Sequence, residues 1–134
     1  MPTDERVLNT LACTLKACRA EKELALCYEN ALTAQPNTEF IMADLFYCYL
    51  RLGQPKKMQL LAVKLYKLTG RAMFVFWSVS SMTQQSDLPP AMLTVAERMI
   101  DKVFNEGTGA AHAPGKHSML YGIMLYFTVQ CYTV

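Results

Sequence analysis

The sequence is poor in the residues and motifs that carry out chemistry. It has only two histidines, its five cysteines form no CxxC pair, and it contains no Gly-x-Gly-x-x-Gly, Walker A or Gly-x-Ser-x-Gly motif. Phosphate-binding loops and nucleophile elbows need such glycines for their tight turns, so neither kind of site is expected. His112 and His117 have no carboxylate or cysteine close by to complete a metal set. We therefore expect no catalytic residue, no cofactor and no metal site.

The sequence also lacks a strong excess of charge. The formal net charge is +2, which is too small to indicate DNA binding. Its first five residues are polar and acidic, unlike the basic start and apolar core of a secretion signal. An odd number of cysteines without such a signal indicates free thiols and a cytoplasmic location. We expect Cys18, Cys27 and Cys48 to pack between helices as small apolar residues.

What the sequence does contain is a series of apolar stripes at helical spacing. Apolar residues make up 52% of the chain. Pro36, Gly53 and Gly70 are placed to end helices, Pro55 to start one, and Thr3 to cap the first. The pattern predicts six helices with these buried stripes: Val7, Leu8, Leu11 and Leu15; Leu24, Tyr28, Ala31 and Leu32; Phe40, Ile41, Leu45, Tyr49 and Leu52; Met58, Leu61, Leu65 and Leu68; Phe74, Trp77, Val79 and Met82; Met92, Val95, Ala96, Met99, Ile100 and Val103.

Two stretches of the chain match each other at an offset of 34 residues. The matched positions are Leu11, Leu15, Leu24, Tyr28, Ala31 and Pro36 against Leu45, Tyr49, Met58, Ala62, Leu65 and Gly70. This period resembles that of tetratricopeptide (TPR) repeats, which stack into a curved scaffold that binds other molecules. We therefore predict an all-α, TPR-like α-solenoid of about three antiparallel helix pairs over residues 1–104.

The pattern ends after Val103. Residues 105–118 are rich in Gly and Ala without an apolar period, which predicts a flexible loop. Residues 119–134 carry no charge, but these sixteen residues fall short of the roughly 20 that a membrane helix needs. We interpret this apolar tail as a truncated helix of a further repeat and do not expect a membrane protein. A strand and a membrane anchor remain alternatives for the tail.

The repeat register places a set of side chains on the concave groove of the solenoid. By resemblance to TPR proteins, the first repeat would present Asn9, Cys13 and Lys16, and the second Ala43, Tyr47, Leu50 and Arg51. TPR domains that grip acidic chaperone tails use Lys, Asn and Arg at fixed groove positions. Those positions here hold Asn9, Cys13, Asp44, Phe74 and Ser78. The chaperone clamp is largely absent, and Asp44 would repel a carboxylate.

The fourth helix carries a second candidate surface. Lys57, Lys64, Lys67 and Arg71 recur at helical spacing on one side, and no acidic residue lies between Asp44 and Asp87. Such a face could meet an acidic surface or RNA phosphates. The ordinary alternative is a solvated helix face. We predict partner binding by Asn9, Lys16, Tyr47, Arg51, Lys57, Lys64, Lys67 and Arg71.

A more specific resemblance runs from about Leu24 to Val103. Its ordered fragments are Leu45-Phe46, Arg51-Leu52-Gly53, Lys56-Lys57-Met58-Gln59, Leu65-Tyr66-Lys67, Phe76-Trp77-Ser78-Val79, Gln84-Gln85-Ser86 and Ala96-Glu97-Arg98-Met99-Ile100. In this order they resemble the auxiliary subunit of the NatB N-terminal acetyltransferase complex. That subunit is a long α-solenoid, so the resemblance implies a fragment or short form of it.

The resemblance implies a non-catalytic role. The auxiliary subunit wraps the NatB catalytic subunit and helps to place the complex at the ribosome. NatB acetylates nascent chains that begin Met-Asp, Met-Glu, Met-Asn or Met-Gln, and the acetyl-CoA site belongs to the catalytic subunit. The expected partners are therefore the catalytic subunit and the ribosome. The alternative is a general TPR adaptor unrelated to acetylation.

Overall fold

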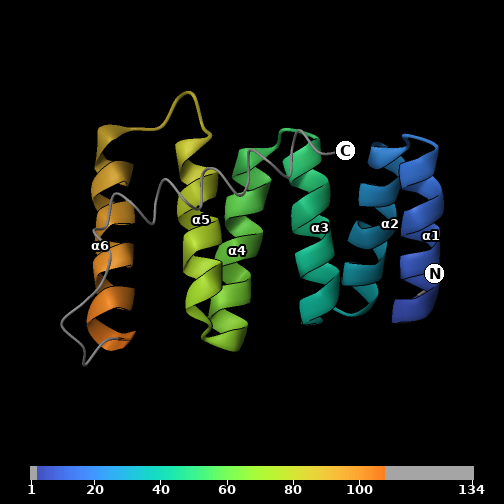
Figure 1. Ribbon diagram of the computed structural model, residues 1–134, viewed down its shortest axis with the longest axis horizontal. Helices are drawn as coiled ribbons and strands as arrows, with labels where there is room; N and C mark the ends of the chain where they lie inside the picture. Colours follow the sequence, from blue (N-terminus) through green and yellow to red (C-terminus); the bar gives the residue numbers. More distant parts are fainter. Residues whose placement is uncertain (1–2, 108–134) are drawn as a thin grey trace.

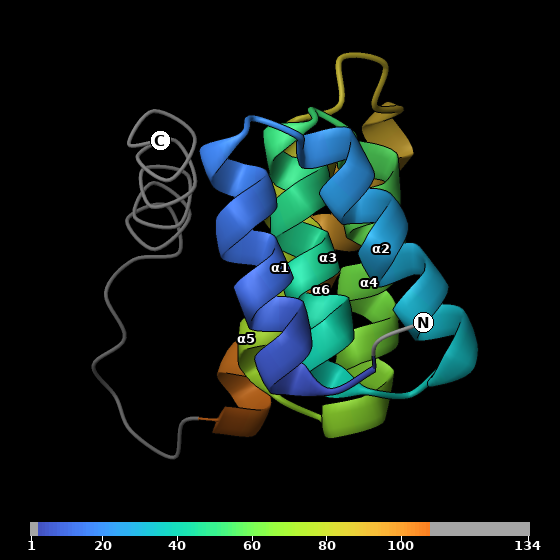
Figure 2. The same cartoon turned by 90° about the vertical axis from the view of Figure 1, so that its right-hand side faces the viewer.

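The computed structural model describes residues 3–107, excluding the side chains of Phe104 and Glu106, and within this range the chain forms helices joined by turns. Each helix packs against the next along the chain (Figure 1). Figure 2 shows α1, α3 and α5 on one side, with α2 and α4 on the other. The predicted all-α, TPR-like solenoid is confirmed. The helices are α1 (Glu5–Ala17), α2 (Glu21–Ala34), α3 (Glu39–Arg51), α4 (Pro55–Thr69), α5 (Ala72–Thr83) and α6 (Pro90–Gly107).

The helix starts follow the repeat period of 34 residues closely. Glu5 and Glu39 open α1 and α3 one period apart, and Glu21 and Pro55 do the same for α2 and α4. In the third pair, α5 starts one residue early and α6 one residue late. The first two repeats are therefore in register, whereas the third is slightly shifted.

The helices start and end at the expected Gly and Pro residues, but the cap of α1 differs from the prediction. Gly53 and Gly70 have φ of 64° and 69°, a left-handed conformation that glycine adopts at little cost. Pro55 is the first residue of α4. The cap of α1 is Asp4 and not Thr3: its carboxylate accepts hydrogen bonds from the backbone N–H of Arg6 at 2.9 Å and of Val7 at 3.3 Å. Asp is a strong capping residue because its oxygens satisfy these otherwise unpaired donors.

The core runs through the stack as two clusters. The larger joins α1 to α4 with the first half of α5, and it includes the fully buried Tyr28, Phe46 and Phe74. A smaller cluster joins the second half of α5 to α6. Helix α5 is buried on nearly every side, because it packs between α4 and α6. It contributes residues to both clusters.

An aromatic group connects the second repeat to the third. The Trp77 ring stacks on Phe46 at 4.5 Å between centroids and meets Phe74 and Tyr47 edge-on at 5.1 and 5.3 Å. Such geometries add to the free energy that area burial alone provides. Trp77 is therefore a principal contact between α3 and α5.

Some residues expected in the core are exposed. Val7, Leu68 and Val95 have exposed fractions of 50%, 44% and 41%, because each lies on the outer side of its helix. Cys48 is buried as predicted. Cys18 is exposed, since it follows the last turn of α1 and packs against no helix face.

The boundary expected at residue 104 falls inside α6, which continues to Gly107, so residues 105–107 are helical and not loop. The rest of the expected loop, with His112 and His117, and the 119–134 tail lie outside the described residues. Between residues 3 and 107, no helix is long and apolar enough to cross a membrane.

Candidate functional site

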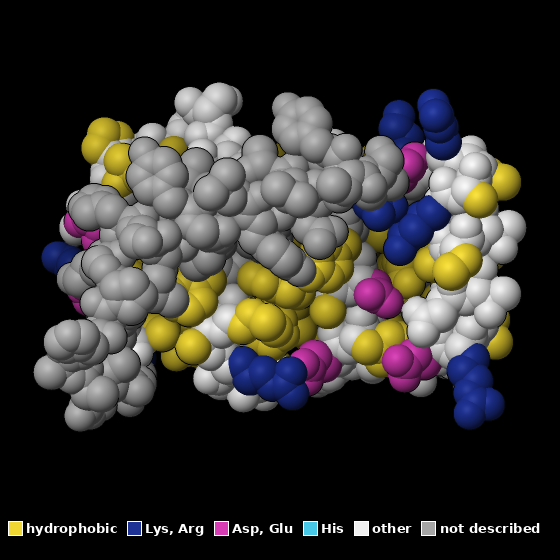
Figure 3. Space-filling model, in the orientation of Figure 1, with side chains coloured by type: hydrophobic (Ala, Val, Ile, Leu, Met, Phe, Trp, Pro, Cys, Tyr) yellow, Lys and Arg dark blue, Asp and Glu magenta, His cyan; other side chains and the backbone are white. Residues whose placement is uncertain are grey.

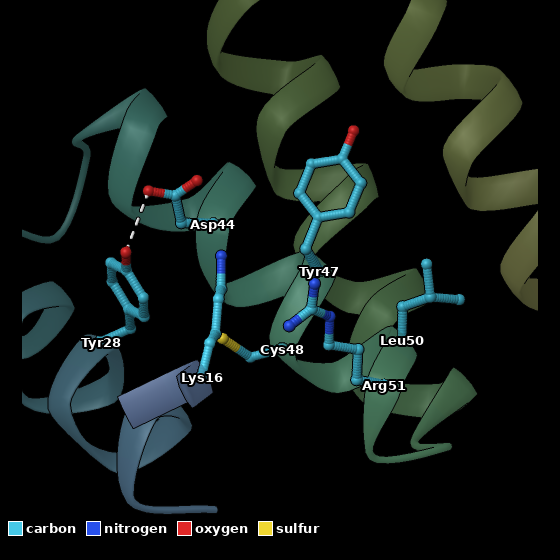
Figure 4. Close-up of a pocket in the computed structure, with 7 residues that line it drawn as sticks. All are labelled: Lys16, Tyr28, Asp44, Tyr47, Cys48, Leu50 and Arg51. Carbon is cyan, nitrogen blue, oxygen red and sulfur yellow. Dashed lines mark hydrogen bonds between the residues drawn. The ribbon is translucent and has the colours of Figure 1, made fainter. Parts of the chain in front are cut away.

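A small polar pocket lies where the first repeat meets the second. It has a volume of about 210 Å³. Of the predicted groove residues, the structure brings together Lys16, Tyr47, Leu50 and Arg51. The full lining, drawn in Figure 4, is Lys16 from α1, Tyr28 from α2, and Asp44, Tyr47, Cys48, Leu50 and Arg51 from α3.

One side of the pocket is a tyrosine–carboxylate pair. The Tyr28 hydroxyl donates to Asp44 Oδ2 at 3.1 Å, and the body of Tyr28 is buried in the core. Burial raises the pKa of Tyr28 well above its usual range, and the neighbouring Asp44 charge raises it further. Burial also raises the pKa of the Asp44 carboxyl, although the Tyr28 hydrogen bond and the Lys16 charge oppose this effect. The pair fixes Asp44 against α2.

The other side of the pocket is cationic. Figure 4 shows the head groups of Lys16 and Arg51 directed into the same space. One terminal guanidinium nitrogen of Arg51 is buried and has no hydrogen-bond partner among the described residues. Two positive charges therefore face the single carboxylate of Asp44 across the pocket. A site with this charge balance favours an anionic group.

Cys48 lies at the base of this pocket but is not suited to chemistry. Burial raises the pKa of its thiol to about 11, so the thiol stays protonated at neutral pH. Only the thiolate is an effective nucleophile. The Cys48 thiol is therefore a weak nucleophile in this pocket.

Sequence reasoning missed two pocket residues. Tyr28 was assigned to an apolar stripe, and Cys48 was assigned to packing between helices. The signal for Tyr28 was its hydroxyl, which a buried tyrosine must pair. Asn9 and Cys13 are exposed on α1 and lie outside the pocket lining. Ser78, expected at a groove position, is instead buried in the core, because α5 packs between α4 and α6. Phe74, which shares that groove position in the TPR register, is buried as its apolar stripe predicts.

The basic surface predicted on the fourth helix is less basic than its sequence indicated. Arg71 does not lie on α4, which ends at Thr69, but caps the start of α5, and Lys56 in the first turn of α4 adds a fifth cation to this surface. Arg71 pairs with Glu39 at 2.7 Å, Lys57 with Glu29 at 3.6 Å, and Lys56 with Asp87 at 3.1 Å. These acids come from α2, α3 and the turn before α6, so the local sequence of α4 could not reveal them. Figure 3 shows the opposite side of the molecule, that of α1, α3 and α5, where side chains of both charge signs and hydrophobic side chains are mixed.

The remaining two cations of this face differ from each other. Lys64 donates to the backbone carbonyl of Pro36 at 2.8 Å, which ties α4 to the end of α2. Lys67 is exposed. Lys57 also lies 5.0 Å from the Tyr49 ring centroid, and the Tyr49 hydroxyl donates to Glu29 Oε1 at 2.6 Å. Lys57 and Lys64 thus hold neighbouring repeats together.

The repeat architecture agrees with the comparison with known families. The family model described as the Psidin N-terminal TPR repeats region matches residues 1–127. The chain belongs to this family. The match extends over nearly the whole sequence, so it includes all six helices of the described residues.

The chain is also similar to several named proteins. The N-alpha-acetyltransferase 25, NatB auxiliary subunit, of human is 34% identical over 119 residues, or 84% of this chain. The phagocyte signaling-impaired protein of Drosophila pseudoobscura is 30% identical over 79% of the chain. The NatB complex auxiliary subunit NAA25 of Arabidopsis thaliana is 35% identical over 61%. The chain spans about 12% of the length of the human and fly relatives and about 8% of the plant one.

Proposed function

We propose that the chain is a non-catalytic scaffold of the NatB auxiliary type. In this function it binds the NatB catalytic subunit and supports co-translational N-terminal acetylation of chains that begin Met-Asp, Met-Glu, Met-Asn or Met-Gln. The observation that carries the proposal is the 34% identity to auxiliary subunits over 84% of the chain. The stacked helix pairs support it, because solenoids of this kind provide extended binding surfaces.

The side with α1, α3 and α5 is the proposed contact surface for the catalytic subunit. Lys16, Tyr47 and Arg51 meet at one pocket there, and Asn9 is exposed on α1. Tyr and Arg are enriched among residues that dominate binding energy at interfaces. We expect Tyr47 and Arg51 to contribute more to binding than Asn9, which lies outside the pocket lining.

Coexpression with the NatB catalytic subunit of the same organism tests this proposal. The complex should co-elute in gel filtration, and acetylation of a Met-Asp peptide from acetyl-CoA should exceed that of the catalytic subunit alone. Arg51→Gln should weaken co-elution, whereas Lys22→Gln on the exposed side of α2 is the matched control. If a full-length auxiliary subunit carrying this sequence formed no complex, the proposal would be wrong. Capture of unrelated factors in its place would favour a general TPR adaptor.

We also propose that ribosome association uses Lys64 and Lys67. The other three cations of the α4 face lie beside carboxylates, whereas Lys67 is exposed and Lys64 bonds only a neutral carbonyl. Contacts to RNA phosphates weaken with salt because counterions are released on binding. Lys67→Glu should therefore release the complex from ribosomes at lower salt in sedimentation. Lys22→Glu is the control, and identical salt profiles for wild type and Lys67→Glu would refute the assignment.

A further inference from the structure

In the pocket between α1 and α3, one buried guanidinium nitrogen lacks a hydrogen-bond acceptor among the described residues. A buried guanidinium N–H without an acceptor costs free energy, and most native structures avoid it. Arg51 has such a nitrogen, and Lys16 shares the same space. The one carboxylate in the lining, Asp44, is held on the far side by Tyr28 at 3.1 Å. An acceptor from outside the described residues would complete the site.

The size and walls of the pocket limit what that acceptor can be. A volume of about 210 Å³ is below the roughly 300–1,000 Å³ of typical small-molecule sites, but it is sufficient for one side chain. Tyr47 and Leu50 provide apolar surface beside the cations. Methylene groups could lie against them while a charged end reaches Arg51. A short acidic side chain has both features.

We infer that this pocket receives the carboxylate of a glutamate or aspartate side chain from a partner protein. Arg51 would turn its buried, unpartnered guanidinium nitrogen toward the carboxylate and donate to it, and Lys16 in the same lining would add a second positive charge. Hydrogen bonds between charged groups of this kind are about twice as strong as neutral ones. The site is distinct from the chaperone clamp positions, since it draws its cations from Lys16 and Arg51. It does not depend on which protein supplies the carboxylate.

Asp44 gives the inference a specific signature. Its negative charge lies in the same lining and opposes any incoming carboxylate. Removing that charge while keeping the shape, as in Asp44→Asn, should tighten binding of an acidic ligand. It should not tighten binding of a neutral ligand of the same shape. A merely structural role for the pocket would not produce this difference.

The test is an NMR titration of the ¹⁵N-labelled chain with N-acetyl-glutamate methylamide. We expect shifts at Arg51 and its neighbours on α3, with a dissociation constant on the order of 1 mM. Arg51→Gln should weaken binding about tenfold or more, because it removes a charge-assisted bond of about 1.5–3 kcal/mol. Lys16→Gln should weaken it less, and Asp44→Asn should strengthen it a few-fold. Lys22→Gln on α2 should leave it unchanged.

Two controls make the outcome decisive. N-acetyl-glutamine methylamide should cause no comparable shifts, and inorganic phosphate should bind less tightly than the glutamate probe. Equal binding of the glutamine probe, or tighter binding of phosphate, would overturn the inference. Circular dichroism establishes whether Arg51→Gln remains folded. If it does not, the exposed Lys16→Gln and the Asp44→Asn variants decide, and unchanged affinity in both would refute the proposal.

Discussion

Replacing Trp77 by Ala should destabilise the chain strongly. Trp77 is only 7% exposed and contacts three aromatic rings from α3 and α5. A buried Trp removes about 200 Å² from water, which at about 25 cal/mol per Å² gives an upper bound of about 5 kcal/mol. Truncations of buried Phe and Trp to Ala cost about 3–5 kcal/mol. We expect a loss of about 3–5 kcal/mol in the free energy of unfolding.

Urea denaturation followed by circular dichroism is the appropriate assay. Fluorescence would not serve, because Trp77 is the sole tryptophan of the chain. Leu60→Ala is the matched control: Leu60 is 73% exposed on α4, so its truncation should change stability by no more than about 0.5 kcal/mol. A loss below about 1 kcal/mol for Trp77→Ala would mean that the α3–α5 contact is not a principal source of stability.

A companion variant tests how much stability a smaller aromatic ring at position 77 restores. Trp77→Phe keeps an aromatic ring near Phe46, whose centroid lies 4.5 Å from that of Trp77. Stacked pairs contribute about 0.5–1.5 kcal/mol beyond area burial. Trp77→Phe should therefore cost clearly less than Trp77→Ala. Equal losses for the two variants would show that a phenyl ring at this position restores neither the buried area nor the contact with Phe46.

Three further predictions concern single positions. Gly70→Ala should lower the free energy of unfolding by about 1–2 kcal/mol in urea denaturation, because φ is 69° and a residue with a Cβ is strained there. The added Cβ would meet no atom within 4 Å, so the cost comes from backbone conformation alone. An unchanged free energy of unfolding would contradict the left-handed cap. Tyr49→Phe should lose about 1–2 kcal/mol, since it removes the 2.6 Å hydrogen bond to the partly exposed Glu29; in a Glu29→Gln background the loss should shrink, and an undiminished loss would argue against the pair. Burial raises the pKa of Asp44 above its usual 3.8, so the folded state takes up a proton at a higher pH than the unfolded chain. The stability that Asp44 contributes is therefore fully present below pH 3.8 and is lost as the pH rises through the folded pKa. Wild type should gain stability relative to Asp44→Asn on acidification. A stability difference that does not change with pH would refute this.

The sequence predicted best those features of the fold that depend on one or two neighbouring residues, such as helix starts and ends. Gly53, Pro55 and Gly70 marked helix ends that the structure reproduces, because their backbone preferences act within one or two residues. The third repeat was less predictable. Helix α5 is apolar on all sides, so its periodicity could not tell groove from core, and Ser78 was misplaced for this reason.

The candidate site was predictable only in part. The repeat register found Lys16, Tyr47 and Arg51, because equivalent positions of successive first helices face the same side. It did not find the pairing of Tyr28 with Asp44 or the burial of one Arg51 nitrogen. Both depend on how α2 and α3 pack, and no spacing along one helix contains that information.

The sequence by itself determined the helices, their period and the family, because stripes, caps and breakers act over short distances and repeat along the chain. Only the tertiary structure decided which charges meet. Lys57 on α4 forms an ion pair with Glu29 on α2, and Arg71 at the start of α5 forms one with Glu39 at the start of α3. These partners are distant in sequence, and helix packing sets the distances on which their electrostatic interactions depend. For the same reason, the sequence of α4 indicates a strongly basic surface, whereas in the fold Lys56 and Lys57 each lie beside a carboxylate from another part of the chain.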